Sequence, residues 1–239
     1  TKESIMSFLI AVYVNEGIVL ASDRRTTYNN TQVENGILIQ KIGIHTNNST
    51  DKTFICPNGV GISTCGDASL MGKPITGFIQ DVIRNQITKD STVESVPKTF
   101  IDYFSSLPEI PDTHFIVAGY ENQTQKQKIY KVDIKNKSST LVNTDSQGAT
   151  WDGEITTLVR LIQDVAIKNE DGSYSALPFE NILWNYFTLQ DAVDFARYAV
   201  ETTIQTMRFK NVVETVGGDV DILVITPQET KWLQKKQLF

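Results

Sequence analysis

The stretch SFLIAVYVNEGIVLASDRR, residues 7–25, decides how this chain folds. Two apolar runs rich in β-branched residues, 8–14 and 18–21, flank the turn-forming triplet Asn15-Glu16-Gly17. This pattern predicts a β-hairpin. Its second strand would end at Asp23-Arg24-Arg25, and the hairpin would therefore place a carboxylate beside two cations.

A second stretch, DKTFICPNGVGISTCGDAS at residues 51–69, repeats the design. Apolar runs at 53–56 and 60–65 lie on either side of a Pro57-Asn58-Gly59 turn, and Gly66 follows the second run. The pattern predicts another hairpin. Two adjacent hairpins of this kind would bring a hydroxyl, a carboxylate, an ammonium group and a backbone N–H close together.

Length, charge and composition limit the class of protein. The chain has 239 residues, 40% of them hydrophobic, and no linker-like shift in composition, so we expect one domain over residues 1–239. A net charge of −6 argues against nucleic acid or an anionic membrane as the main partner. No apolar run approaches the roughly 18 residues that span a bilayer, and no signal-peptide pattern is visible. A cytoplasmic location is expected.

The chain contains few soft metal ligands. Cys56 and Cys65 both lie in apolar runs, which predicts buried free thiols and a reducing compartment. With only two histidines, His45 and His114, a structural zinc site is not expected. Neither histidine has a visible partner, and nothing in the sequence indicates a cofactor or a metal.

Periodicity predicts the remaining elements. The polar residues 26–35 are expected to form a loop, and residues 169–185 a loop or short strands. Further strands are expected at residues 37–44, 114–118, 128–133, 139–142 and 220–225. Helices are expected at residues 67–87 and 93–107. A third helix should begin after Asp152 as its N-cap, and a fourth should begin at Thr188, with Asp191 at the capping-box distance.

The order of these elements predicts the fold class. Blocks of strands alternate with blocks of helices, which favours antiparallel sheets with helices layered outside. The first strands show little polar alternation, so both of their faces should be covered. We therefore expect an α+β fold in which two sheets pack face to face between layers of helices.

Five segments, taken in order, resemble one family. They are GIVLASDRRTT (17–27), the hairpin from Lys52 to Gly66, FIVAGYE (115–121), KIYKVDI (128–134) and ETVGGDVDILVIT (214–226). They are spread from residue 17 to residue 226, so the likeness extends over nearly the whole chain, and they resemble β-type proteasome subunits and their bacterial relatives. Those proteins are N-terminal nucleophile (Ntn) hydrolases with a four-layer αββα fold. The resemblance implies a peptide or unfolded-protein substrate, a homo-oligomeric ring and an unfoldase partner.

The resemblance also implies a role for particular residues. Ser7 would be the nucleophile, where most relatives have threonine, and Asp23 would orient and charge the site lysine, Lys52. The backbone N–H of Gly66 would form the oxyanion hole. Arg25 takes the place of the basic residue commonly found near the aspartate.

General chemistry supports these roles. A serine hydroxyl needs a base beside it, and a terminal α-amine, with a pKa of about 8, can serve as that base. An ammonium group held nearby by Asp23 would move the pKa of the amine towards the operating pH. One oxyanion donor contributes on the order of 3 kcal/mol in other hydrolases.

The amino end departs from the family pattern. Ser7 can act through its own amine only when residues 1–6 are absent. These residues are a propeptide, or translation begins at Met6 and that methionine is removed, or the extension is permanent and the protein is inactive. In a fourth reading Thr1 is the nucleophile, although six extra residues would carry it far from Asp23 and Lys52.

Other departures concern single positions. Val213 and Val216 stand where many relatives have Asp and Ser, and Gly148-Ala149-Thr150 replaces a GSG-like turn, with Thr150 as a substitute hydroxyl. Lys41 is an alternative to Lys52 as the site lysine. These losses point to the divergent bacterial branch of the family or to lost activity.

Two functions of different classes follow. The first is a proteasome-type peptidase or amidohydrolase that acts through Ser7. It would self-associate through apolar segments such as residues 182–187. A hydrolase of small amides is a variant of this first function. The alternative is a catalytically inactive structural subunit of the same fold.

Overall fold

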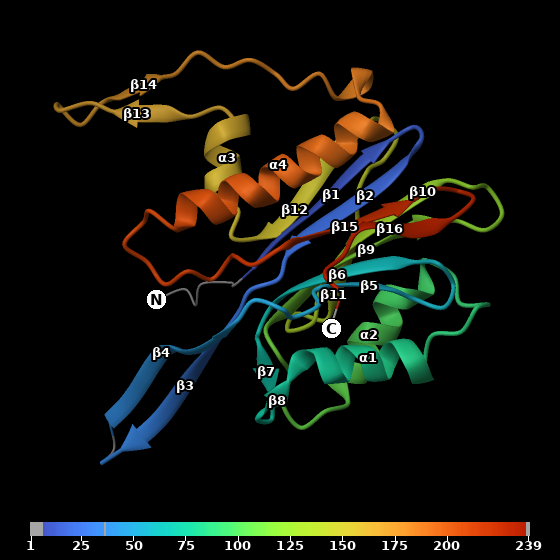
Figure 1. Ribbon diagram of the computed structural model, residues 1–239, viewed down its shortest axis with the longest axis horizontal. Helices are drawn as coiled ribbons and strands as arrows, with labels where there is room; N and C mark the ends of the chain where they lie inside the picture. The colour runs from blue at the N-terminus through green and yellow to red at the C-terminus, as the bar shows by residue number, and fades with distance from the viewer. Residues whose placement is uncertain (1–6, 36, 238–239) are drawn as a thin grey trace.

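The computed structural model of the protein describes residues 7–35 and 37–237. Two five-stranded antiparallel sheets form its centre (Figure 1). The first sheet has the order β12 (Gly148–Gly153), β1 (Phe8–Val14), β2 (Gly17–Asp23), β15 (Val220–Ile225) and β16 (Thr230–Gln234). The second has the order β11 (Ser138–Leu141), β10 (Gln127–Asp133), β9 (Thr113–Tyr120), β6 (Gly61–Gly66) and β5 (Thr53–Ile55).

Both predicted hairpins are present, but they belong to different sheets. β1 pairs with β2 in the first sheet, and β5 pairs with β6 in the second. Leu9 and Leu20 from the first hairpin share a core with Ile116 and Ala118 of β9, so the two sheets pack on each other. The ends of the two hairpins therefore meet across the space between the sheets.

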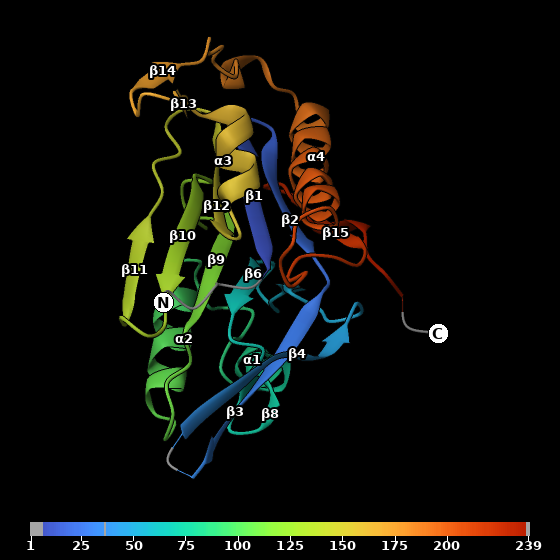
Figure 2. The same ribbon diagram turned by 90° about the vertical axis from the view of Figure 1, so that its left-hand side faces the viewer.

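Helices cover the other face of each sheet (Figure 2). α4 (Leu189–Met207) and α3 (Thr156–Ile162) share a core with the first sheet, and α1 (Ile75–Asn85) and α2 (Ser95–Ser105) share one with the second. Every residue of β1 is buried, because Leu9 faces the second sheet while Ile10 faces α4. This explains why β1 lacks polar alternation.

Several predicted elements are confirmed. β15 occupies the predicted residues, and α4 begins at the predicted capping box, in which the Thr188 side chain and the Asp191 side chain each bond the other's backbone. None of the helices described in residues 7–35 and 37–237 has the length and apolar character needed to cross a membrane.

The prediction of a loop at residues 26–35 is wrong. The chain there forms β3 (Thr26–Glu34), which pairs with β4 (Ile37–Asn47) as a two-stranded ribbon projecting from the body of the protein (Figure 1). A projecting ribbon has no core to cover, so its strands do not need the apolar alternation by which strands are recognised.

Two further features differ from the prediction. The helix expected from residue 67 begins only at Ile75, because β7 (Ser69–Leu70) and β8 (Lys73–Pro74) form a small hairpin whose turn residues, Met71 and Gly72, have positive φ. Asp152 does not cap a helix; it lies in β12, a strand that the sequence pattern missed. The prediction for residues 169–185, a loop or short strands, is confirmed: the segment includes the short strand β14 (Tyr174–Ala176), which pairs with β13 (Ala166–Lys168), and ends in η1 (Trp184–Tyr186).

Candidate active site

Asp23 is the centre of the site. Its carboxylate is fully buried at the end of β2 and accepts four hydrogen bonds. Oδ1 accepts from the backbone N of Phe8 (3.0 Å) and from Lys52 Nζ (2.8 Å), while Oδ2 accepts from the backbone N of Arg25 (3.0 Å) and of Gly217 (2.9 Å). These four donors, three of them from other parts of the chain, hold this carboxylate in one orientation.

Lys52 is the lysine that meets Asp23. Its ammonium group is buried and forms an ion pair with Asp23. Burial lowers the pKa of Lys52, and the charge and hydrogen bond of Asp23 oppose that shift only in part. The rival, Lys41, lies exposed on the ribbon, opposite Asn30, and does not share this environment.

Ser7 lies directly before β1 and is buried. Its carbonyl oxygen accepts a hydrogen bond from the backbone N of Glu154 (2.8 Å). Its φ of 87° lies in the left-handed region, which residues other than glycine rarely adopt. A Cβ on neighbouring Gly153 would lie 2.0 Å from the Ser7 carbonyl oxygen. The end of β12 therefore fixes the backbone of Ser7 in a strained conformation.

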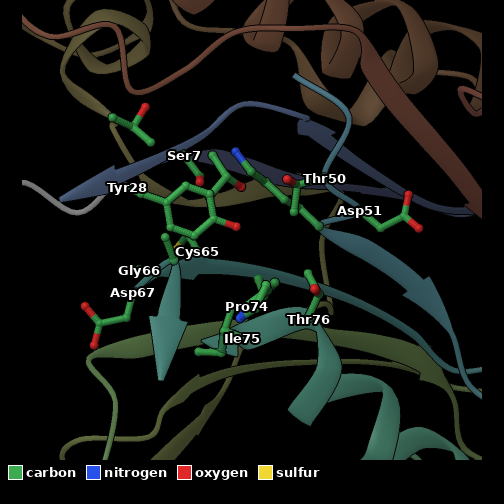
Figure 3. Close-up of a pocket in the computed structure, with 15 residues that line it drawn as sticks. Ser7, Tyr28, Thr50, Asp51, Cys65, Gly66, Asp67, Pro74, Ile75 and Thr76 are labelled. Carbon is green, nitrogen blue, oxygen red and sulfur yellow. The ribbon is translucent and has the colours of Figure 1, made fainter. Parts of the chain in front are cut away.

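Ser7, Lys52 and Gly66 line the same pocket (Figure 3). Tyr28, at the base of the ribbon, also lines it, and in Figure 3 its ring lies between Ser7 and Gly66. The ring stacks on that of His45, with centroids 5.8 Å apart. Tyr28 carries no sequence signal for the site, because it lies in the polar segment in which a loop is expected.

Gly66 ends β6 at a position that only glycine fits. Its φ is 113°, and a Cβ there would lie 2.2 Å from the carbonyl oxygen of Asp112. The backbone of Gly66 is thereby held beside the pocket. The role of its N–H as an oxyanion donor remains a prediction.

Replacement of Gly66 by alanine is expected to destabilise the protein by about 3 kcal/mol, because the new methyl group meets backbone atoms and the backbone angle is unfavourable. At roughly 2–4 °C per kcal/mol for a chain of this size, the melting temperature should fall by about 6–12 °C. Circular dichroism during heating measures this change.

Gly77 provides the matched control. It lies in α1, where a Cβ would have no heavy atom within 4 Å. Gly77→Ala should leave stability unchanged or raise it by up to about 1 kcal/mol, since alanine favours a helix. Equal melting temperatures for the two variants would show that Gly66 is not constrained as described.

Arg25 does not reach the pocket. Its Nε donates to Asn48 Oδ1 (2.8 Å), and its Nη1 forms an ion pair with Glu214. The guanidinium lies over Gly217, where a Cβ would be 2.5 Å from Arg25 Cζ. Arg25 was predicted as a site residue, but the structure places its side chain behind the site, against the glycine whose N–H binds Asp23.

The neighbouring Arg24 was not singled out from the sequence. It is fully buried, and its Nη1 lies 2.6 Å from Asp221 Oδ2 and 2.9 Å from Asp51 Oδ1. Burial raises the pKa of Asp221, although Arg24 opposes this. This network ties the end of β2 to β15 and to the segment that carries Lys52.

Cys65, which lines the pocket, lies next to His114. Both cysteines are buried and free, as predicted. His114, however, has partners that the sequence did not reveal, because its Nδ1 lies 3.3 Å from both carboxylate oxygens of Asp152. This hydrogen bond raises the pKa of His114. Burial alone would raise the pKa of Asp152, but His114 and Lys131 together lower it.

Other predicted positions lie away from the pocket or beyond the described chain. Thr150 lies in β12 opposite Ala11, and the pocket lining in the described chain does not include it. Val216 is buried in the core beneath α4. Thr1 and Met6 lie outside the described residues, so the true amino terminus remains a matter of prediction.

Comparison with known proteins gives the fold but no closer relation. No protein-family model and no curated protein matches the sequence. The structure is similar to that of Anbu from Hyphomicrobium sp. strain MC1, with a TM-score of 0.56, 12% identity, and coverage of 96% of this chain and 88% of that one. A Gly-1 mutant of the same protein has a TM-score of 0.58 and 12% identity, with coverage of 95% of this chain and 87% of that one. At 12% identity, this similarity shows that the chain shares its fold with Anbu.

Proposed function

We propose that this protein is a divergent proteasome-like Ntn hydrolase that cleaves peptide bonds through Ser7. The observation that carries the proposal is the convergence of Ser7, Lys52 and Gly66 on one pocket, with Asp23 fixed behind them by four hydrogen bonds. These residues come from both sheets, and their convergence depends on how the two hairpins face each other.

The proposed reaction begins when the Ser7 hydroxyl attacks the carbonyl carbon of the peptide. The α-amine of Ser7, exposed after removal of residues 1–6, accepts the hydroxyl proton. The buried Lys52 ammonium, held by Asp23, keeps that amine unprotonated. The N–H of Gly66 stabilises the oxyanion. The amine of the leaving group takes up the proton, and water then hydrolyses the acyl-enzyme.

Two features support this proposal. The helices and two sheets agree with the four-layer arrangement of Ntn hydrolases, and the chain shares its fold with Anbu. The left-handed backbone at Ser7 places strain directly after the bond that must break to expose the amine. Backbone strain of this kind persists where it serves a function.

We also propose self-assembly into a ring. In the segment at residues 182–187, Leu183 is 65% exposed and Tyr186 is 81% exposed, while Trp184 packs against Phe187 and Phe195. Exposed apolar side chains on an ordered aromatic base are typical of protein interfaces.

The alternative is an inactive structural subunit. It is favoured by the residues that precede Ser7, because a serine within a chain has no amine of its own. The two functions predict different amino termini in the cellular protein, so the terminus and the reactivity of Ser7 decide between them.

The test compares two preparations, one beginning at Ser7 and one carrying residues 1–6. Each is incubated with a peptide carrying an electrophilic warhead and examined by intact mass and peptide mapping. The first should gain a single adduct at Ser7, and the second should gain none unless it is processed. Absence of labelling in both preparations, with the fold intact, would favour the structural subunit.

A further inference from the structure

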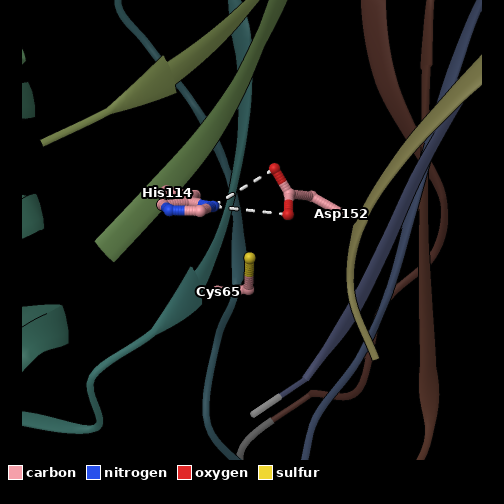
Figure 4. A group of neighbouring side chains, drawn as sticks. All are labelled: Cys65, His114 and Asp152. Atoms are coloured by element: carbon pink, nitrogen blue, oxygen red, sulfur yellow. Dashed lines mark hydrogen bonds and ion pairs between the residues drawn. The ribbon is translucent and has the colours of Figure 1, made fainter. Parts of the chain in front are cut away.

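Three strands bring a thiol, an imidazole and a carboxylate together beside the pocket. Cys65 of β6 pairs with His114 of β9 in one sheet, and Asp152 of β12 approaches from the other. One donor atom from each of the three lies within 4.8 Å of the others. In Figure 4 the Cys65 sulfur points towards the space between the imidazole and the carboxylate.

The distances fit ligands around an ion. His114 Nδ1 lies 3.3 Å from both Asp152 oxygens, longer than the usual N–H···O distance of about 2.9 Å. Ligands about 2.0–2.1 Å from a tetrahedral ion are separated by roughly the distance seen here. A Cys-His-Asp proton relay fits less well, because it needs the thiol and the carboxylate on opposite nitrogens. Here Nδ1 faces Asp152, and Nε2 faces other groups.

Those other groups are two more carboxylates. His114 Nε2 lies 3.7 Å from Asp133 Oδ2 and 4.0 Å from Asp112 Oδ1. A metal-binding histidine usually presents its second nitrogen to a carboxylate, which orients the ring and makes the ligand more basic. His114 therefore has acidic groups on both sides, as a metal-binding imidazole does.

We propose that Cys65, His114 and Asp152 bind a divalent ion of the zinc type. A thiolate and a carboxylate together neutralise the charge of the ion, and a Cys, His and carboxylate set is a donor chemistry that zinc prefers. Cys65 also lines the pocket, so the ion can enter from there and keep a water as its fourth ligand. The site does not depend on the proposed peptidase activity.

Lys131 opposes binding. Its Nζ lies 3.4 Å from Asp152 Oδ2 and also donates to the Trp151 carbonyl oxygen (2.9 Å). An ion at the site would repel this ammonium group. Lys131→Gln should therefore tighten metal binding by roughly several-fold.

The experiment is a titration of the metal-free full chain with Co²⁺, followed by competition with Zn²⁺. The expected result is a thiolate-to-cobalt absorption band and the visible bands of tetrahedral cobalt, saturating at about one equivalent and abolished by Zn²⁺. Zn²⁺ should also raise the melting temperature, because it binds the folded state.

Cys56 provides a matched control, since it is also buried and free but lies in the core around α1 and α2. Cys65→Ser should lose the thiolate band and the Zn²⁺-dependent rise in melting temperature, and Cys56→Ser should keep both. His114→Gln should likewise lose them, which covers the case in which Cys65→Ser does not fold. Asp133→Asn should weaken Co²⁺ binding by about 10-fold.

Three results would overturn the proposal. They are absence of the thiolate band in the unmodified protein, equal bands in the Cys65→Ser and Cys56→Ser variants, and unchanged binding in His114→Gln. Peptidase activity is not among the measurements, so failure of the metal site and failure of the proposed peptidase remain distinguishable.

Discussion

Replacement of Ser7 by alanine is expected to abolish peptide hydrolysis by the chain that begins at residue 7. Loss of the nucleophile alone lowers kcat by about 10⁶ in a well-studied serine hydrolase, and a loss of that order would leave no detectable turnover here. The Asp23–Lys52 pair does not involve the Ser7 hydroxyl, so it should remain. Steady-state assays with fluorogenic peptides measure the effect.

Two variants make this result specific. Ser7→Thr keeps the hydroxyl and should retain measurable turnover. Ser69→Ala removes an exposed serine near the pocket and should retain full activity. If Ser7→Ala hydrolyses peptides as fast as the unmodified protein, Ser7 is not the nucleophile.

The second large effect is on stability. Asp23→Ala should lower the free energy of unfolding by about 3–5 kcal/mol, because it leaves the Lys52 ammonium buried without its partner. It also removes the acceptor of three backbone N–H groups. The melting temperature should fall by roughly 6–20 °C. Chemical denaturation and thermal scans both report this loss.

A second substitution tests the cause. In the double variant Asp23→Ala/Lys52→Met the unpaired charge is gone, so part of the lost stability should return. Asp194→Ala, at an exposed position on α4, should change stability by less than about 0.5 kcal/mol. A loss below about 1 kcal/mol for Asp23→Ala would contradict the central role given to this carboxylate.

The sequence predicted best those elements whose burial imposes a pattern. β1, β2 and β15 are continuous apolar runs because both faces are covered, and α4 has both an apolar stripe and a capping box. β3 and β12 were missed because their residues meet fewer packing demands. Asp152 was misread as a helix cap because a lone Asp before an apolar periodicity is also the usual signal for a helix start.

The candidate site was predicted unevenly for a similar reason. Asp23 and Gly66 follow predicted strands and Lys52 precedes one, so their proximity followed from bringing the ends of the two hairpins together. Two partners of His114, Asp133 and Asp152, lie on β10 and β12, and only the tertiary fold brings them to the histidine. The direction of the Arg25 side chain likewise depends on Glu214, at the other end of the chain.

The contacts that close the site around Asp23 affect when activity can appear during synthesis. The Gly217 N–H that binds Asp23 is separated from it by 194 positions, and the pair of Arg24 with Asp221 spans 197. Contacts between such distant residues form late, because most of the chain must be available before they can. In a ribosome-bound chain that stops before residue 217, the first hairpin would be present, but Asp23 would lack the Gly217 donor and Arg24 would lack Asp221. The proposed hydrolase would therefore remain inactive until residues 217–221 have been translated.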